Sequence, residues 1–109
     1  MSDIEQLLDE IRRFNEDRDW DQFHNGKDLA VALSIESAEL LECFLWKKPE
    51  DAQPAKIREE LADVLCYAFQ MADKYGLDIK QIILEKLERN AQKYPVETAR
   101  GSAKKYDEL

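Results

Sequence analysis

The chain has 109 residues, 44% of them hydrophobic and 37% charged, with a formal net charge of −8 at pH 7. This composition suits one packed domain and excludes a disordered chain. The negative charge disfavours a nucleic acid polymer as partner, and no apolar run approaches the roughly 20 residues of a membrane span. The acidic N-terminus does not resemble a secretory signal, and Cys43 and Cys66 are not spaced as a metal-binding pair. We therefore expect a cytoplasmic protein with two reduced thiols, and no membrane partner.

Hydrophobic periodicity predicts four helices and no strands, so the expected fold is all-α. Ser2 and Glu5 have the spacing of a capping box at the start of the first helix. Gly76 is placed to end the third helix, and the fourth is expected to begin after Asp78 and to stop before Pro95. The helices are expected at about 3–18, 27–46, 55–75 and 79–94, followed by an irregular polar tail over 95–109.

The second helix is apolar on every side. From Asp28 to Trp46, 13 of 19 residues are apolar, and they do not keep to one face. A helix with this pattern is buried all round, which a single 109-residue domain achieves with difficulty. We expect one domain over residues 1–109, a four-helix bundle that assembles as a homodimer or as a dimer of dimers with this helix near the interface.

Four acidic residues interrupt the apolar pattern at matching places. Glu36 and Glu39 stand three apart in the second helix, and Glu60 and Asp63 stand three apart in the third. A short loop makes the two helices antiparallel and sets residues whose numbers sum to about 100 opposite each other. The four carboxylates are therefore expected at similar heights, converging on one point.

Converging carboxylates repel one another unless a positive charge lies between them, and no Lys or Arg falls among them. A ligand set made of acidic oxygen atoms suits Mg²⁺, with Mn²⁺ as a substitute. His24 is the only histidine and lies outside both helices, which disfavours a di-iron site. The alternative is that some of these acids are solvated, as we expect for Glu42, Glu59 and Asp73.

The two acidic motifs, Glu36-Ser-Ala-Glu39 and Glu60-Leu-Ala-Asp63, resemble the ExxE and ExxD signature of the all-α, MazG-like nucleotide pyrophosphohydrolases. The dCTP pyrophosphatase branch is the nearest match. The likeness covers nearly the whole chain, and it extends to the segments 18–24, 45–47, 59–67, 93–95 and 101–109.

The resemblance implies an enzyme that hydrolyses a nucleoside triphosphate, with dCTP or a related dNTP favoured, to the monophosphate and pyrophosphate. It implies Mg²⁺ held by Glu36, Glu39, Glu60 and Asp63, a bundle built from paired subunits, and a house-cleaning role in the nucleotide pool. The same carboxylates are then the catalytic residues, with Glu39 as the candidate general base.

A nucleobase needs an aromatic face to stack on. Trp20, Trp46 and Tyr67 are candidates, with packing in the core or at an interface as the alternative. His24 is a candidate ligand contact or a packing residue. In the resembling family the region of the fourth helix serves the nucleotide, and three polar residues share one face there. These are Lys86, Asn90 and Lys93, which a solvated charged face would also explain.

The alternative hypothesis is a protein without enzymatic activity. A dimeric helical interaction module with a metal-stabilised acidic core would share the same helices. Such a module has no need for four unpaired acids that face inward beside aromatic residues, so the sequence favours the hydrolase.

Overall fold

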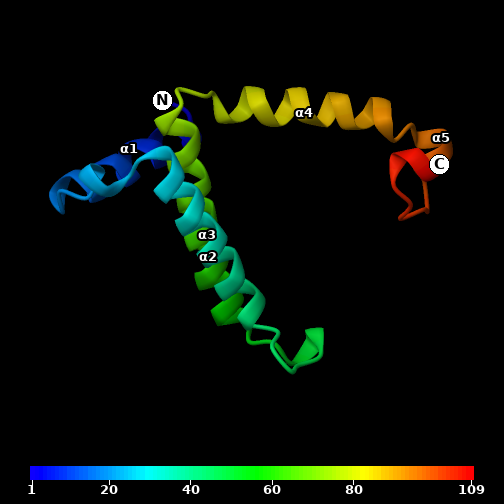
Figure 1. Cartoon of the computed structure of the whole chain (residues 1–109), viewed down its shortest axis with the longest axis horizontal. Coiled ribbons are helices and arrows are strands. Elements are labelled where there is room, and N and C mark those ends of the chain that lie inside the picture. Colours follow the sequence, from blue (N-terminus) through cyan, green and yellow to red (C-terminus); the bar gives the residue numbers. More distant parts are fainter. The chain divides into compact units, whose positions relative to one another are not determined.

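A computed structural model describes all 109 residues as helices, turns and loops, with no strand. The all-α prediction is confirmed. The chain forms two compact units, Met1–Leu77 and Asp78–Leu109 (Figure 1). No helix is both long enough and apolar enough to cross a membrane. The four-helix bundle, the single domain over 1–109 and the oligomer stay predictions.

The first unit holds three helices: α1 (Asp3–Asp17), α2 (Gly26–Glu42) and α3 (Pro54–Lys74). The capping box predicted for α1 is present, because the Ser2 side chain accepts from the Glu5 N–H and the Glu5 side chain accepts from the Ser2 N–H. Helices α2 and α3 pack side by side as an antiparallel hairpin, and α1 contacts α3 (Figure 1). This hairpin carries the predicted acids.

Helix α2 starts slightly earlier and ends four residues earlier than predicted. Asn25 caps its start by accepting from the Asp28 N–H at 2.9 Å. After Glu42 the backbone tightens into i→i−3 hydrogen bonds, and Trp46 adopts a left-handed conformation with φ 59°. Because a left-handed residue cannot continue an α-helix, Trp46 lies in the connecting loop, which includes a 3₁₀ turn at Pro49–Asp51.

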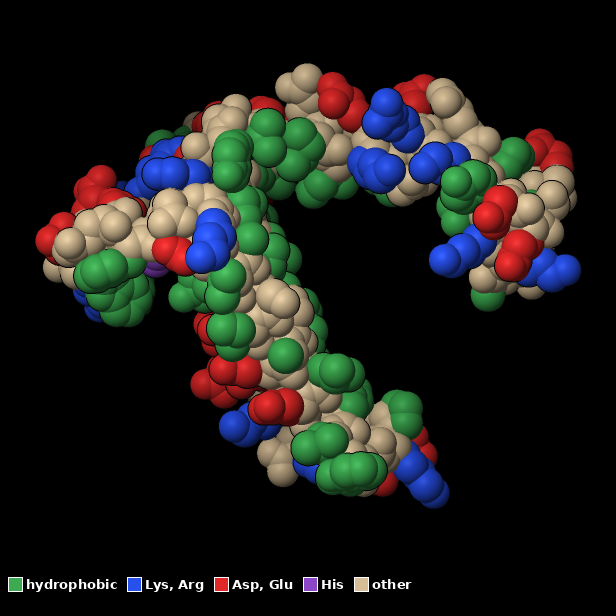
Figure 2. Space-filling view, in the orientation of Figure 1, with side chains coloured by type: hydrophobic (Ala, Val, Ile, Leu, Met, Phe, Trp, Pro, Cys, Tyr) green, Lys and Arg blue, Asp and Glu red, His purple; other side chains and the backbone are tan.

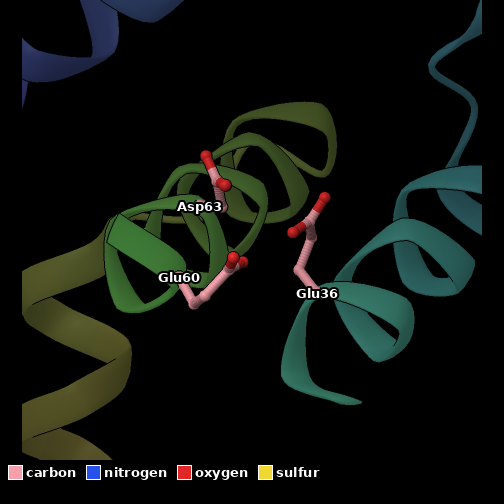
Figure 3. A group of neighbouring side chains, drawn as sticks. All are labelled: Glu36, Glu60 and Asp63. Carbon is pink, nitrogen blue, oxygen red and sulfur yellow. The ribbon is translucent and has the colours of Figure 1, made fainter. Parts of the chain in front are cut away.

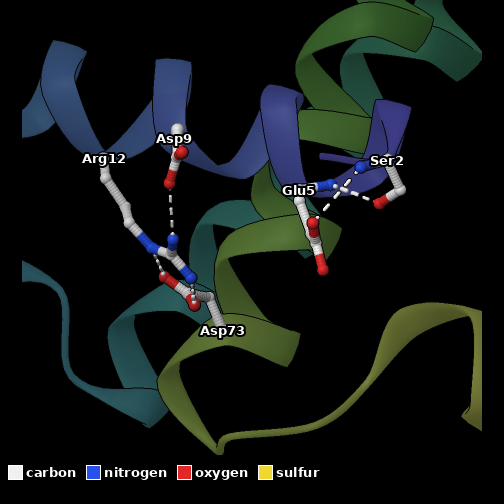
Figure 4. Close-up of polar contacts among 5 residues, drawn as sticks. All are labelled: Ser2, Glu5, Asp9, Arg12 and Asp73. Atoms are coloured by element: carbon white, nitrogen blue, oxygen red, sulfur yellow. Dashed lines mark hydrogen bonds and ion pairs between the residues drawn. The ribbon is translucent and has the colours of Figure 1, made fainter.

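Helix α1 is fixed to α3 by polar contacts that the sequence analysis did not anticipate. The Arg12 guanidinium donates to both carboxylate oxygens of Asp73, at 3.0 Å for Nε, and also to Asp9 (Figure 4). Asn15 is buried and donates to Gln70 at 2.8 Å. The expectation that Asp73 is solvated is wrong, because the side chain faces α1 and pairs with an arginine there.

The first unit buries few side chains of its own. Leu29, Ala52 and Ala72 are its buried apolar residues. Large apolar side chains of α2 stay open to solvent, including Ile35 at 54% exposure and Leu41 at 71%, and apolar surface extends over the hairpin in Figure 2. Within one chain, α2 is therefore not covered on all sides.

The second unit holds α4 (Ile79–Lys93), which begins after Asp78 and ends before Pro95, as predicted. The Asp78 side chain accepts from the Gln81 N–H at 2.9 Å. The tail expected to be irregular contains a short helix, α5 (Val96–Ala99), and a 3₁₀ turn over 106–108.

Candidate active site

The antiparallel hairpin brings the predicted acids together. Glu36 projects from α2, and Glu60 and Asp63 project from α3 into the space between the helices (Figure 3). One carboxylate oxygen from each of the three lies within 4.8 Å of the others. Glu39 is half-buried one turn beyond Glu36 on α2. The register that sets 36 near 63 and 39 near 60 is thus the one expected from the short loop.

These carboxylates are poorly satisfied by the protein itself. Glu36 Oε2 and Glu60 Oε2 are buried and have no hydrogen-bond partner. The ion pairs of the chain join Arg12 to Asp9 and Asp73, and Arg13 to Glu10, so none reaches the cluster. A buried carboxylate oxygen without a partner costs free energy, which a bound cation would offset.

The same crowding changes the pKa of the clustered groups. The pKa of Glu36 rises from 4.5 to about 7, first through burial and then through the neighbouring carboxyl of Glu39 and the charges of Asp63 and Glu60. Burial, and then the charge of Glu39, also raises the pKa of Glu60. Burial is thus the main cause of both shifts, and the neighbouring carboxylates add to it, so a bound cation would favour the ionised form of both groups.

The donor set fits a hard divalent cation. All the clustered ligand atoms are carboxylate oxygens, the ligands that Mg²⁺ and Mn²⁺ favour, and no histidine or cysteine belongs to the group. Cys66 lies one turn from Asp63, but burial and then the charge of Asp63 raise the pKa of its thiol, which keeps it protonated. No other group of acids, histidines or cysteines in the chain has metal-binding spacing.

An open pocket of about 520 Å³ adjoins the acids. Glu36 and Asp63 line one part of it, and three of the predicted substrate-binding residues, Trp20, His24 and Tyr67, line another. The His24 and Tyr67 rings meet edge to face with their centroids 6.4 Å apart. We call this the aromatic pocket. Its volume and its mixture of aromatic and polar lining residues suit a nucleobase with its sugar.

Helix α1 contributes a wall of the aromatic pocket that the sequence analysis missed. Phe14 packs edge to face on Trp20, with ring centroids 5.6 Å apart. The Arg18 guanidinium lies over the Phe14 ring, 3.7 Å from its centroid. Ile11 and Gln70 line the pocket as well. In the sequence Phe14 belongs to the apolar stripe of α1, and no local pattern distinguishes it from a core residue. Its place in the pocket wall could therefore not be predicted.

Other predicted residues are not brought to the acids within the first unit. Trp46 is 95% exposed in the loop after α2. Lys86, Asn90 and Lys93 lie on α4, where basic side chains gather over its second half (Figure 2). The Lys93 ammonium lies 5.1 Å from the centroid of the Tyr106 ring, so the tail folds against the end of this helix. Their roles stay predictions.

Comparison with known proteins places these features in a family. Residues 31–109 match the MazG-like family, a segment that includes all four acids and begins after Trp20 and His24. The mouse and human proteins named dCTP pyrophosphatase 1 are 40% and 38% identical to this chain, each over 96% of it and 69% of the relative. A crystal structure described as a pyrophosphatase from Archaeoglobus fulgidus superposes with a TM-score of 0.81 at 37% identity, over 87% of this chain and 94% of that one. The chain belongs to the MazG-like family.

Proposed function

We propose that this protein is a Mg²⁺-dependent pyrophosphatase that hydrolyses a dNTP, with dCTP favoured, to dNMP and pyrophosphate. Similarity to the dCTP pyrophosphatases and to the archaeal pyrophosphatase identifies the chain as a nucleoside triphosphate pyrophosphohydrolase. One observation carries the proposal for the chain itself. Three carboxylates converge beside an aromatic pocket large enough for a nucleoside, and two of them, Glu36 and Glu60, have a buried oxygen without a hydrogen-bond partner.

The charges of site and substrate require a cation. A triphosphate carries about four negative charges near neutral pH, so it cannot approach four carboxylates without a bridging cation. Glu36, Glu39, Glu60 and Asp63 would hold Mg²⁺, or Mn²⁺ in its place. When bound, the metal supplies charge neutralisation at phosphate oxygens and lowers the pKa of water.

The other proposed roles, namely proton transfer and contacts with the base and the phosphates, fall to side chains of the protein. Glu39 is the candidate general base, because its carboxyl lies near those of both Glu36 and Glu60, whose pKa values it raises. Trp20 and Tyr67 offer ring faces for the base, and His24 borders the same pocket. Outside this pocket, we assign Trp46 to stacking on the base. We assign contacts with the phosphates to Lys86, Asn90 and Lys93.

We also propose a homodimer or a dimer of dimers, acting on the cytoplasmic nucleotide pool as a house-cleaning enzyme. The apolar side chains of α2 that a single chain leaves open support an interface there, since Val31, Ile35 and Leu41 are 45%, 54% and 71% exposed. Sedimentation equilibrium tests the assembly, and a monomer at micromolar concentration would refute it.

The activity is tested by measuring pyrophosphate release from a panel of dNTPs with Mg²⁺, with Mn²⁺ and with EDTA. We expect release to depend on the metal and to be fastest with dCTP or a 5-modified dCTP. Hydrolysis that survives EDTA would refute the metal site. No release from any nucleotide would instead favour the non-enzymatic helical module.

A further inference from the structure

A second pocket, of about 290 Å³, lies farther along the hairpin toward its loop. Glu39 and Glu60, two of the clustered acids, border it, so it adjoins the acid cluster just as the aromatic pocket does. Its other lining residues are Glu42, Cys43, Lys47, Gln53 and Lys56. We call it the lysine pocket. The proposed function gives no role to its residues Lys47, Gln53 and Lys56.

The cationic groups of the lysine pocket are unpaired. Neither Lys47 nor Lys56 has a carboxylate within 4.0 Å, although Glu39, Glu42 and Glu60 line the same pocket. The pocket also lies at the first turn of α3, where helix backbone dipoles add partial positive charge. Gln53 precedes this turn and makes no capping hydrogen bond, so its amide is free to donate.

The hairpin therefore presents three environments in a fixed order: aromatic rings, acids, and lysines. Asp63 and Lys56 are seven residues apart on α3, which corresponds to about 10 Å along the helix axis. Long lysine side chains span part of that distance toward the acids. A nucleotide with its base in the aromatic pocket and its α-phosphate at the acids would extend its remaining phosphates toward the lysines.

We propose that the lysine pocket binds the β- and γ-phosphates of the substrate and holds pyrophosphate after cleavage, in addition to the contacts proposed for Lys86, Asn90 and Lys93; this inference rests on the proposed function. In the reaction, a water oxygen forms a bond to the α-phosphorus, and its proton passes to a carboxylate of the cluster. The bond from the α-phosphorus to the bridging oxygen breaks, and its electron pair stays on pyrophosphate. Lys47 and Lys56 neutralise part of the charge that this leaving group carries.

The test compares the Lys47→Gln/Lys56→Gln double variant with the unmodified protein. Titration calorimetry with inorganic pyrophosphate in the presence of Mg²⁺ gives its affinity without turnover. Inhibition of dCTP hydrolysis by pyrophosphate and by dCMP separates the two product sites. We expect pyrophosphate affinity to fall at least tenfold and KM for dCTP to rise, while dCMP affinity changes less than twofold.

Lys48→Gln is the matched control, because Lys48 lies in the same loop and does not line the pocket. It should behave as the unmodified protein. Pyrophosphate affinity unchanged in the double variant would overturn the inference, and so would an equal loss of dCMP affinity. If the unmodified protein hydrolyses no dNTP, the proposed function fails, while the calorimetric comparison still decides whether the lysine pocket binds pyrophosphate.

Discussion

Replacing Glu36 by Gln is expected to stabilise the metal-free protein at pH 8 and to leave its stability nearly unchanged at pH 5. The pKa of Glu36 rises to about 7 in the folded protein from 4.5, chiefly through burial and then through Glu39. The folded state therefore binds a proton more tightly than the unfolded chain does. This contribution to stability is fully present below pH 4.5 and is lost as the pH rises through 7, whereas Gln is neutral throughout.

The size of the effect follows from the shift. An unscreened shift from 4.5 to about 7 corresponds to a difference of about 3 kcal/mol in the free energy of unfolding. Glu36 is only half-buried and solvent screens its charge, so we expect about 1 kcal/mol at pH 8. That corresponds to a rise of about 4 °C in Tm for a chain of this size.

The assay is thermal unfolding followed by circular dichroism, in EDTA, at pH 5 and pH 8. Glu16→Gln is the control, because Glu16 is exposed on α1 and forms no ion pair. Adding Mg²⁺ at pH 8 should raise the Tm of the unmodified protein more than that of the Glu36 variant. A Glu36 variant that is less stable at pH 8, or that differs equally at both pH values, would refute the electrostatic reasoning.

Three further changes test other parts of the structure. Asp63→Asn should lower kcat for dCTP at least a hundredfold while the far-ultraviolet spectrum is unchanged, and near-normal turnover would remove Asp63 from the site. Gly26→Ala should change the Tm by less than about 2 °C, because an added Cβ would meet only the ring end of Tyr75, whose side chain is 61% exposed and can rotate into solvent; a loss of several degrees would show that the ring is held in place. A double-mutant cycle of Arg12→Met and Asp73→Asn should give a coupling of about 0.5 to 1 kcal/mol in urea unfolding; no coupling would show that solvent screens the pair completely.

The fold was predictable wherever local chemistry decides it. Ser2 with Glu5, Asp78 with Gln81, and Pro95 mark helix ends through short-range hydrogen bonds or a missing N–H, and the structure places the ends there. The end of α2 was predicted four residues too late, because its apolar run continues to Trp46 while the backbone does not. Hydrophobicity indicates which residues are buried, but it does not indicate backbone conformation. The left-handed conformation of Trp46 could therefore not be read from the apolar run.

The acid cluster was predictable for a related reason. Helical spacing and a short loop fix which residues of a hairpin face each other, so Glu36, Glu60 and Asp63 could be placed together without coordinates. The contacts of α1 could not, since no short-range rule sets where Arg12 meets α3. The lysine pocket was hidden for the same reason, because Lys47 and Lys56 are nine residues apart across a loop whose path the sequence does not specify.

The polar contacts between α1 and α3 help to hold the hairpin together against the repulsion among its acids. Carboxylates that repel one another across the hairpin weaken the contact between α2 and α3. The Arg12–Asp73 contact (Figure 4) and the Asn15–Gln70 contact join α3 to α1 near the end of the hairpin that carries the aromatic pocket. A metal would replace repulsion by coordination and add its binding free energy to folding. Metal binding should therefore tighten the aromatic pocket and also keep the acids ionised. Nucleotide affinity should then depend on the metal, even though the base itself does not contact the metal.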